Sequence, residues 1–205
     1  MNYYIDFDNT LYETSKLTIL TLNKIVEMVL GNNIENKEER KAIIEGFNST
    51  KGNLFTYAEE IANKYKANPK QVVESIKELI ENTRELTYKD GESFLKKLKE
   101  NGHKLILLTY IPSDKNQEFQ MSKIIGSGLK EYFDEILITS EYKFTIDIDY
   151  KSGIFIDDNP RDLNGLYERN PIKVIRIRKK ENKYSLIDIS NKEIEEHEFF
   201  DEIQI

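Results

Sequence analysis

MNYYIDFDNTL, residues 1–11, begins the chain with an apolar and aromatic run that carries two aspartates, Asp6 and Asp8, and then breaks at Asn9 and Thr10. This pattern predicts a buried strand that ends in an acidic turn. A strand buried on both faces belongs in the middle of a parallel sheet, and such sheets bind ligands outside the carboxyl ends of their strands. Two carboxylates this close favour a bound cation, naturally Mg²⁺. The alternative is an Asx-turn in which both side chains cap backbone groups.

The composition limits the kinds of protein that this chain can be. Its 205 residues suit one domain, or a core domain with a modest insertion. The net charge of -7 indicates neither a nucleic-acid footprint nor a polybasic membrane surface. The absence of cysteine excludes disulfides and thiolate chemistry, and two histidines argue against a histidine-built metal site. No signal-like or membrane-spanning apolar run is present, so a cytoplasmic location is expected.

Residues 15–85 follow a helical pattern and are expected to form a helical-bundle cap inserted into the core. Apolar periodicity predicts helices over residues 17–29, 37–47 and 55–65 and a fourth from Pro69 onward. The polar loop GFNSTKGN, residues 46–53, lies between the second and third of them. If the bundle covers the acidic turn, Thr50 and Lys51 in this loop are candidates for binding a substrate. The alternative is a plain exposed connection.

Strands alternate with helices in the rest of the chain, which predicts an α/β core with a parallel sheet, formed by residues 1–14 and 86–205. After the first strand, the expected strands are residues 104–109, 135–139, 153–157 and 172–178, and the expected helices are residues 92–101 and 116–125. From Asn182 onward, the chain is expected to add edge strands, a hairpin or a dimer contact.

Polar side chains follow the carboxyl ends of the predicted strands. Because the carboxyl ends of parallel strands meet at one edge of a sheet, these side chains are expected to converge on one spot. In chain order they are the acid pair Asp6 and Asp8, the hydroxyl of Thr109, the amine of Lys143, the run Asp157, Asp158 and Asn159, and Asp162 four residues beyond Asp158.

These fragments resemble the haloacid dehalogenase superfamily, and within it the phosphatases that carry a helical cap. DFDNT, with Asp6, Asp8 and Thr10, matches the first motif of that family, LILLT matches the second at Thr109, and IDDNPRD matches the fourth at Asp158 and Asp162. Each fragment alone is weak, but their order and strand placement agree over residues 1 to about 178. The resemblance implies a Rossmann-like parallel sheet with an inserted cap.

The third motif departs from the family pattern. The family lysine usually lies on a helix well before the last acidic strand, whereas only about fourteen residues separate Lys143 from Asp157. The intervening helix is therefore expected to be shortened or lost. This compact arrangement is similar to the 5'(3')-deoxyribonucleotidase branch. Lys143 is the preferred residue, with Lys123 and Lys151 as rivals.

The resemblance implies a phosphoryl-transfer mechanism centred on the acid pair. Asp6 is expected to attack phosphorus and form an aspartyl-phosphate, which splits one difficult displacement into two easier ones. Mg²⁺ held by Asp6, the backbone carbonyl of Asp8 and Asp158 is expected to offset the repulsion between carboxylate and phosphate. Asp8 is expected to protonate the leaving alcohol and later to deprotonate water. An aspartate at this position argues for oxygen–phosphorus chemistry, because halide-removing members of the family lack it.

The remaining motif residues have supporting roles in this interpretation. Lys143 and Thr109 are expected to hold the phosphoryl oxygens, one as a charge and one as a hydrogen-bond donor. Asp162 and Asn159 are expected to contact no substrate themselves but to orient Lys143 or the groups that hold the metal.

The expected activity is Mg²⁺-dependent hydrolysis of a small-molecule phosphate ester, with no nucleic-acid polymer and no membrane as partner; the oligomeric state stays open. A nucleoside monophosphate is the first guess, ahead of phosphoglycolate or a sugar phosphate. A phosphotransferase or phosphomutase with the same nucleophile is an alternative, as is a non-catalytic regulatory protein on the same fold. A receiver-type signalling domain is disfavoured, because no aspartate ends the strand at residues 135–139.

Overall fold

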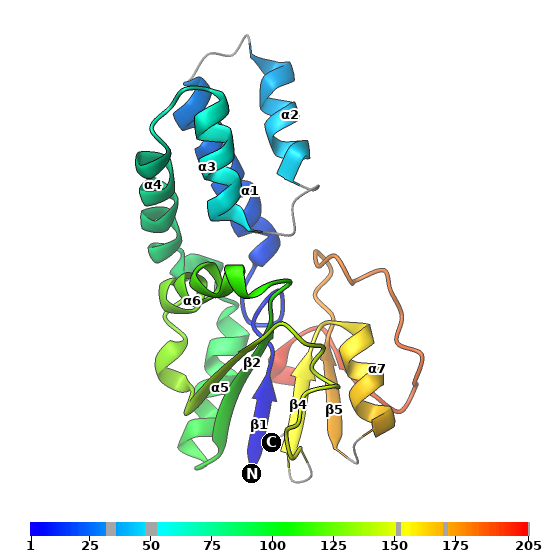
Figure 1. Cartoon of the computed structure of the whole chain (residues 1–205). Helices are drawn as coiled ribbons and strands as arrows, with labels where there is room; N and C mark the ends of the chain where they lie inside the picture. The colour runs from blue at the N-terminus through cyan, green and yellow to red at the C-terminus, as the bar shows by residue number, and fades with distance from the viewer. Residues whose placement is uncertain (32–35, 48–52, 151–152, 170–171, 205) are drawn as a thin grey trace.

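Strand β1, Asn2–Ile5, lies inside a parallel sheet whose strand order is β3-β2-β1-β4-β5-β6 (Figure 1). The computed structural model describes residues 1–31, 36–47, 53–150, 153–169 and 172–204. The other strands are β2 Lys104–Tyr110, β3 Glu135–Thr139, β4 Gly153–Asp157, β5 Lys173–Ile177 and β6 Glu195–His197. The predicted parallel α/β sheet is therefore confirmed, and β1 is flanked by β2 and β4.

Both faces of β1 are buried, which explains its unbroken apolar sequence. Because side chains alternate along a strand, Tyr3 faces helix α5, Lys89–Glu100, where its ring meets Phe94 edge-on at 6.3 Å. Tyr4 faces the other way and belongs to the apolar cluster that includes Leu163 of helix α7, Pro160–Arg169. The two helices thus cover opposite faces of the sheet.

Four helices follow β1 and stand together above the carboxyl edge of the sheet (Figure 1). They are α1 Thr14–Leu30, α2 Lys37–Phe47, α3 Leu54–Lys64 and α4 Pro69–Glu81. Asn53 and Asn68 cap α3 and α4 by accepting hydrogen bonds from backbone N–H groups of the first turn. We call α1 to α4 the helical unit. Within the described chain, none of the helices has the length and hydrophobicity needed to cross a lipid bilayer.

The helical unit shares its apolar core with the α5 side of the sheet. Leu17 and Ile25 of α1 and Ile76 and Ile80 of α4 belong to the same buried cluster as Ile5 of β1. Helices α2, α3 and α4 begin within one residue of their predicted starts, and α1 begins three residues earlier than predicted. The division of the chain into a core and a cap at residues 14–15 and 85–86 stays a prediction.

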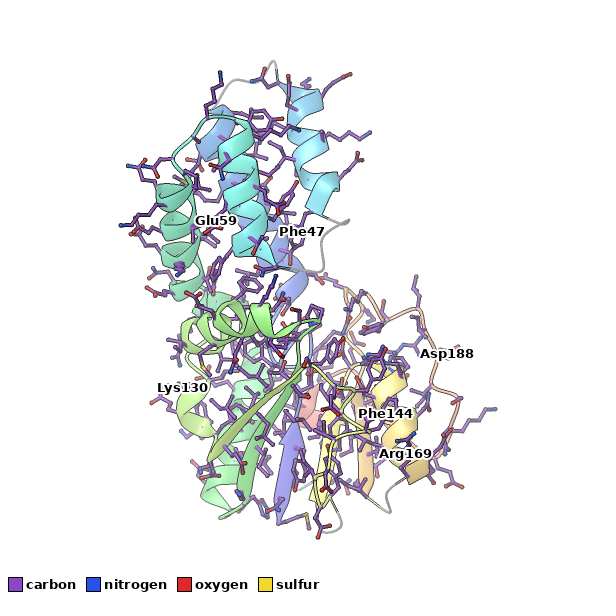
Figure 2. The ribbon with its side chains drawn as sticks, in the orientation of Figure 1. Phe47, Glu59, Lys130, Phe144, Arg169 and Asp188 are labelled. Atoms are coloured by element: carbon purple, nitrogen blue, oxygen red, sulfur yellow. The ribbon has the colours of Figure 1, made fainter. Side chains whose placement is uncertain are left out.

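The connection from β3 to β4 contains no helix over residues 140–150, as the short spacing before Asp157 predicts. Its side chains cover α7 instead. The ring of Phe144 lies so close to Gly165 that a Cβ added there would be 2.6 Å from it, and the Arg169 guanidinium lies 5.0 Å from the ring centre (Figure 2). Gly165 therefore allows this connection to pack tightly on the helix.

Of the alternatives expected from Asn182 onward, the edge strand is confirmed and the hairpin is wrong. The segment KYSLIDIS, residues 183–190, forms turns, and the short β6 then pairs in parallel with β5 at the sheet edge. Arg176 of β5 is the physical reason. Its buried guanidinium donates to the carbonyls of Tyr184 and Ile187, both at 2.8 Å, and so uses backbone groups that a strand ladder would need.

Helix α6, Gln117–Gly126, lies between the helical unit and the sheet (Figure 1). Its last residue, Gly126, touches the end of α4, because a Cβ added there would be 2.0 Å from the carbonyl oxygen of Ile80. Only glycine permits this approach of two backbones. Four short 3₁₀ helices complete the described elements: Arg84–Leu86, Asp114–Asn116, Lys130–Tyr132 and Phe200–Glu202.

We expect Gly126→Ala to lower the free energy of unfolding by about 2 kcal/mol, because the added methyl group must push α6 away from α4. Chemical denaturation measures this loss. The control is Ile125→Ala on the same helix, where a half-exposed side chain should change stability by no more than about 0.5 kcal/mol. Equal stability of Gly126→Ala and the native chain would contradict the close contact.

Candidate active site

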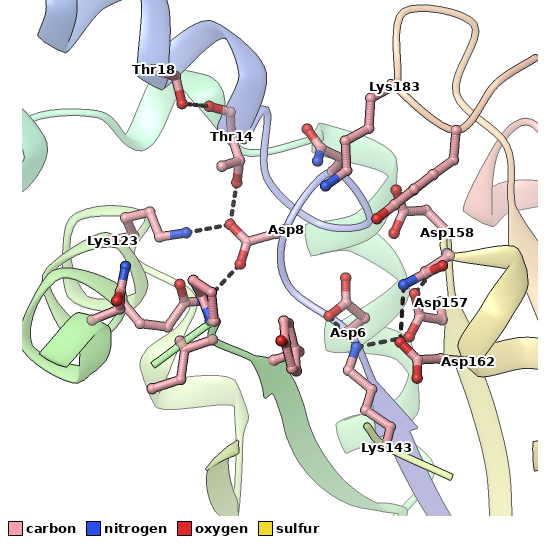
Figure 3. A pocket seen from close by; sticks show the side chains of 18 of the residues that line it. Asp6, Asp8, Thr14, Thr18, Lys123, Lys143, Asp157, Asp158, Asp162 and Lys183 are labelled. Atoms are coloured by element: carbon pink, nitrogen blue, oxygen red, sulfur yellow. Dashed lines mark hydrogen bonds and ion pairs between the residues drawn. The ribbon is translucent and has the colours of Figure 1, made fainter. Parts of the chain in front are cut away.

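The carboxyl ends of β1, β2 and β4 border a cavity of about 380 Å³ that α1 and α6 also line (Figure 3). Its charged lining residues are Asp6, Asp8, Asp157, Asp158 and Asp162 with Lys123, Lys143 and Lys183. Five carboxylates and three ammonium groups leave a net charge of about -2 when all are ionised. The cavity therefore suits a divalent cation, and its size suits a small molecule.

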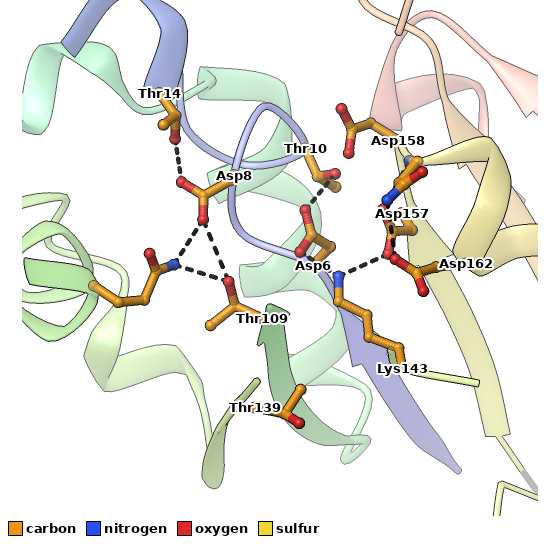
Figure 4. A network of polar contacts seen from close by, with 12 residues as sticks. Asp6, Asp8, Thr10, Thr14, Thr109, Thr139, Lys143, Asp157, Asp158 and Asp162 are labelled. Atoms are coloured by element: carbon orange, nitrogen blue, oxygen red, sulfur yellow. Dashed lines mark hydrogen bonds and ion pairs between the residues drawn. The ribbon is translucent and has the colours of Figure 1, made fainter. Parts of the chain in front are cut away.

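Asp6 lies in a buried cluster with Lys143, and this contact joins the ends of two distant segments (Figure 4). The Lys143 amine donates to Asp6 and, at 2.7 Å, to Oδ2 of Asp157. Thr10 donates its hydroxyl to the other oxygen of Asp6 at 3.0 Å. Since these side chains are at most 6% exposed, their charges must balance each other rather than rely on water.

The loop after β1 directs Asp6 and Asp8 into the cavity because Phe7 between them faces the core. Phe7 is fully buried and stacks on Tyr12 with ring centres 5.0 Å apart. Asn9 then turns the chain with a φ of 60°, and its side-chain oxygen accepts hydrogen bonds from the N–H and hydroxyl of Ser15 at the start of α1. Asparagine tolerates this left-handed conformation. Asn9 therefore both turns the chain and caps the start of α1.

The carboxylate of Asp8 points away from the Asp6 cluster, toward α6 (Figure 4). It accepts hydrogen bonds from Thr14 of α1, from Gln120 of α6 at 2.7 Å and from Thr109 of β2 at 3.3 Å. It also forms an ion pair with Lys123, whose side chain is 3% exposed. Burial alone would raise the pKa of Asp8, but Lys123 and these donors lower it below the usual value. Asp8 is therefore ionised in this arrangement.

The acidic run after β4 continues the cluster around Lys143. Asp157 is fully buried and, besides its ion pair, accepts a hydrogen bond from the Asn159 backbone at 2.8 Å. Asn159 in turn donates its side-chain amide to Asp162 at 2.9 Å. Asp158 accepts a hydrogen bond from the side chain of Asn182, which comes from the turn segment after β5. The acidic cluster is thus held by hydrogen bonds from two segments, through Asn159 after β4 and through Asn182 after β5.

Asp6, Asp157 and Asp158 can each offer one carboxylate oxygen within 4.8 Å of the others. Such a set of buried oxygen donors fits Mg²⁺ or another hard cation. The expected metal set contained Asp6, Asp8 and Asp158, so Asp157 is an addition. The carboxylate of Asp8 is not part of the group, and a role for its backbone carbonyl stays a prediction.

Burial and mutual repulsion change the pKa values of these carboxylates. Burial, together with the nearby Asp157, raises the pKa of Asp6 to about 7, although Lys143 acts in the opposite direction. Burial and the same repulsion raise the pKa of Asp158 well above its usual value. For Lys143, burial would lower the pKa, but Asp157 and Asp6 raise it above its usual value. A cation bound at the cluster would relieve the repulsion and favour the ionised carboxylates.

The structure brings together most of the residues predicted from sequence. Lys143 lies in the Asp6 cluster, whereas its rival Lys123 pairs with Asp8. The other rival, Lys151, lies outside the described residues, and so do the proposed substrate contacts Thr50 and Lys51. Thr109 contacts Asp8 rather than Asp6. The roles assigned to all of these side chains stay predictions.

Several residues of the site were not anticipated as such. Gln120 lies eleven positions beyond Thr109 on α6, and the helical spacing between Gln120 and Lys123 places both on the Asp8 side of that helix. A polar pair on one face of a helix that follows a motif strand is a pattern that sequence analysis can detect. Asn182 and Lys183 gave no such pattern, because their proximity to the site depends on the irregular course of the chain after β5.

Comparison with known proteins places the whole arrangement in a family. A family model described as haloacid dehalogenase-like hydrolase matches residues 4–165. No curated protein matches the chain.

Solved structures share the fold at low sequence identity. A haloacid dehalogenase-like hydrolase from Burkholderia xenovorans has a TM-score of 0.68 at 14% identity, with 97% of this chain and 92% of that chain covered. A HAD-hydrolase, YfnB, from Bacillus subtilis, solved with bound magnesium, has a TM-score of 0.57 at 14% identity, with 98% and 95% covered. An L-2-haloacid dehalogenase from Xanthobacter autotrophicus, with chloropropionic acid covalently bound, has a TM-score of 0.51 at 11% identity, with 90% and 79% covered.

We expect Mg²⁺ to raise the thermal unfolding midpoint more at about pH 8 than at about pH 5.5. Asp6 has a pKa of about 7 in the folded chain against 3.8 for an unperturbed carboxyl, so the folded state holds the extra proton between these values. Without a cation, stability contributed by Asp6 is therefore lost as pH rises from about 4 to about 7, and Asp158 acts in the same direction. Differential scanning fluorimetry with Mg²⁺ or chelator measures both effects. An equal Mg²⁺ shift at the two pH values would contradict this competition.

Asp157→Asn should weaken Mg²⁺ binding by about tenfold or more, because it removes one carboxylate of the cluster and a partner of Lys143. Isothermal titration calorimetry gives the dissociation constant. Asp188→Asn serves as the matched control, since Asp188 is 85% exposed and pairs only with Arg178 among the described residues. Unchanged affinity in Asp157→Asn would remove Asp157 from the metal site.

Proposed function

The chain belongs to the haloacid dehalogenase-like hydrolases, and we propose that it hydrolyses small phosphate monoesters through an aspartyl-phosphate formed on Asp6. The observation that carries this proposal is the separation of the two motif aspartates. Asp6 sits in a cluster that fits a divalent cation, whereas Asp8, two residues away, lies in its own hydrogen-bonded network on the α6 side. One carboxylate is thus arranged as a nucleophile and the other as an acid–base group.

In the first step, a carboxylate oxygen of Asp6 attacks phosphorus as the bond from phosphorus to the alcohol oxygen breaks. The leaving oxygen takes a proton from Asp8. In the second step, Asp8 takes a proton from water, the water oxygen attacks phosphorus, and the bond from phosphorus to Asp6 breaks to release phosphate. Water thereby supplies the oxygen of the product, and Asp6 returns to its starting state.

The cluster around Asp6 sets up this chemistry. Lys143 holds Asp6 in place and contributes positive charge beside the incoming phosphate. Asp6, Asp157 and Asp158 are the residues proposed to hold Mg²⁺, which would supply the charge needed to offset repulsion between a carboxylate and a phosphate dianion. Asp162 and Asn159 support Lys143 and Asp157 from behind through the hydrogen bonds described above.

The network around Asp8 matches the base half of the cycle. With Lys123, Gln120 and Thr109 as partners, the carboxylate is ionised and ready to accept a proton. The acid half requires Asp8 to carry a proton, and a protonated carboxyl no longer forms an ion pair with Lys123. The ion pair between Asp8 and Lys123 is therefore lost and formed again once in each turnover, although the carbonyl oxygen of the protonated carboxyl can still accept a hydrogen bond from the amine.

The cavity supports a small phosphorylated metabolite as substrate. Its volume is about 380 Å³, and Phe47, Tyr110 and Phe119 line it together with the charged groups. The aromatic lining keeps a nucleoside monophosphate in the panel of substrates to test, with phosphoglycolate and sugar phosphates beside it. A phosphotransferase or phosphomutase would share every step up to the aspartyl-phosphate, and a non-catalytic protein would share none.

Asp6→Asn should abolish Mg²⁺-dependent phosphate release from an aryl phosphate and from the metabolite panel, with a loss of at least about a thousandfold in kcat/KM. The loss follows because the amide cannot act as the nucleophile. Asp188→Asn, on an exposed side chain, should retain native activity.

Two further outcomes separate the competing activities. Chloride release from chloropropionic acid without phosphate release would indicate a dehalogenase. Loss of the aryl phosphate without free phosphate, unless an added alcohol accepts the group, would indicate a phosphotransferase. No turnover by a folded protein that binds Mg²⁺ would overturn the proposal.

A further inference from the structure

Lys183 lies on the rim of the candidate active site and comes from the turn segment after β5, outside every family motif. It lines the same cavity as Asp6 and Asp8. Figure 3 shows its side chain on the opposite side of the cavity from Lys123, directed toward the space between Asp8 and Asp158. Both of these carboxylates are near enough to interact with it electrostatically.

Lys183 differs from the other two lysines of the cavity in its partners. Lys143 is held by Asp6 and Asp157, and Lys123 is held by Asp8. Both are nearly fully buried, so their charges are already matched inside the protein. Lys183 is exposed, and among the described residues no carboxylate forms an ion pair with it; its amine lies 4.5 Å from the ring centre of Tyr184.

The backbone on both sides of Lys183 is anchored to the site. Asn182 is buried and donates its side-chain amide to Asp158 and, at 3.4 Å, to the backbone carbonyl of Asn9 in the loop after β1. On the other side, the carbonyl of Tyr184 accepts a hydrogen bond at 2.8 Å from Arg176, which also donates to the carbonyl of Asp158 at 3.3 Å. Lys183 is therefore carried by a fixed turn, and its amine contacts Tyr184 but has no ion-paired carboxylate among the described residues.

A fixed cation beside the reacting centre recognises an anion. The reacting phosphoryl group already faces Lys143 and the proposed Mg²⁺ ligands, whereas Lys183 approaches Asp8 from the opposite side of the cavity to Lys123 (Figure 3). Since Asp8 is the proposed acid for the leaving alcohol, the space beside it belongs to the alcohol part of the substrate.

We propose that Lys183 selects phosphate esters whose alcohol part carries a second acidic group, either a carboxylate or a second phosphate. This proposal rests on the proposed function and specifies its substrate class. It ranks acid-bearing metabolites above nucleoside monophosphates, whose alcohol part is uncharged.

The test compares substrates that differ in one group. Phosphoglycolate and hydroxyethyl phosphate share a two-carbon alcohol part but carry a carboxylate and a hydroxyl, and ethylene glycol bisphosphate carries a second phosphate. We expect the native protein to prefer the acidic substrates by about tenfold or more in kcat/KM, mainly through KM. If the protein prefers one acidic substrate over the other, that preference shows whether Lys183 recognises a carboxylate or a second phosphate.

Lys183→Met should remove this preference and leave kcat/KM for hydroxyethyl phosphate near the native value, whereas Lys183→Arg should retain it. Lys180→Met is the matched control, because Lys180 lies in the same segment but is 81% exposed and pairs with Glu198. An equal loss on all three substrates in Lys183→Met would mean that the lysine contacts the transferred phosphoryl group. That result, or an unchanged preference, would overturn the proposal.

Failure of the proposed function is a separate result, because it would appear as no turnover of any substrate by the native protein. In that case, calorimetry of phosphoglycolate and hydroxyethyl phosphate binding to the Mg²⁺-containing protein decides the role of Lys183. Tighter binding of phosphoglycolate that Lys183→Met abolishes would support it, and equal binding of the two ligands would refute it.

Discussion

The burial of several carboxylates around Lys143 is the interaction on which the rest of the site depends. Asp6 directly follows β1 and Asp157 ends the neighbouring β4, so the parallel register of the two strands brings them together. Like charges at this distance and depth repel strongly, and the ammonium group of Lys143 compensates only part of that charge. Burial first, and repulsion from Asp157 in addition, raise the pKa values of Asp6 and Asp158. Asp6, Asp157 and Asp158 thereby form a buried acidic group that could hold a cation.

The separation of Asp8 from this cluster follows from the same loop. Alternation along the chain places Phe7 in the core and the two aspartates in the cavity, and the turn at Asn9 then directs Asp8 toward α6. Thr14 is the first residue of α1, so the contact of its hydroxyl with Asp8 links that carboxylate to the helical unit. A displacement of α1 relative to the sheet would therefore change the hydrogen bonds of Asp8 directly.

Low sequence identity to solved structures is consistent with how few residues this architecture requires. The sheet needs apolar strands of the right spacing, which many sequences satisfy, whereas the charged cluster needs particular residues at strand ends. At 14% identity, the likeness to the Burkholderia xenovorans hydrolase shows a shared fold alone. The cavity of this chain is lined mainly by residues at and after the strand ends, and the turn segment after β5 adds Lys183 and Tyr184.

The order of strands and helices along the chain and the helical insertion follow from the amino-acid pattern alone. So does the convergence of Asp6, Asp8, Thr109, Lys143 and the acidic run, because strand ends in a parallel sheet meet at one edge whatever the details of packing. The folded structure was needed to show that Asp157 joins Asp6 and Asp158, that Lys123 pairs with Asp8, and that Lys183 reaches the cavity. These facts depend on side-chain direction and on an irregular segment held by Arg176. Side-chain direction and the course of this segment leave no periodic pattern in the sequence. They are fixed by contacts such as Arg176 with Tyr184 and Asn182 with Asp158, which join different parts of the chain.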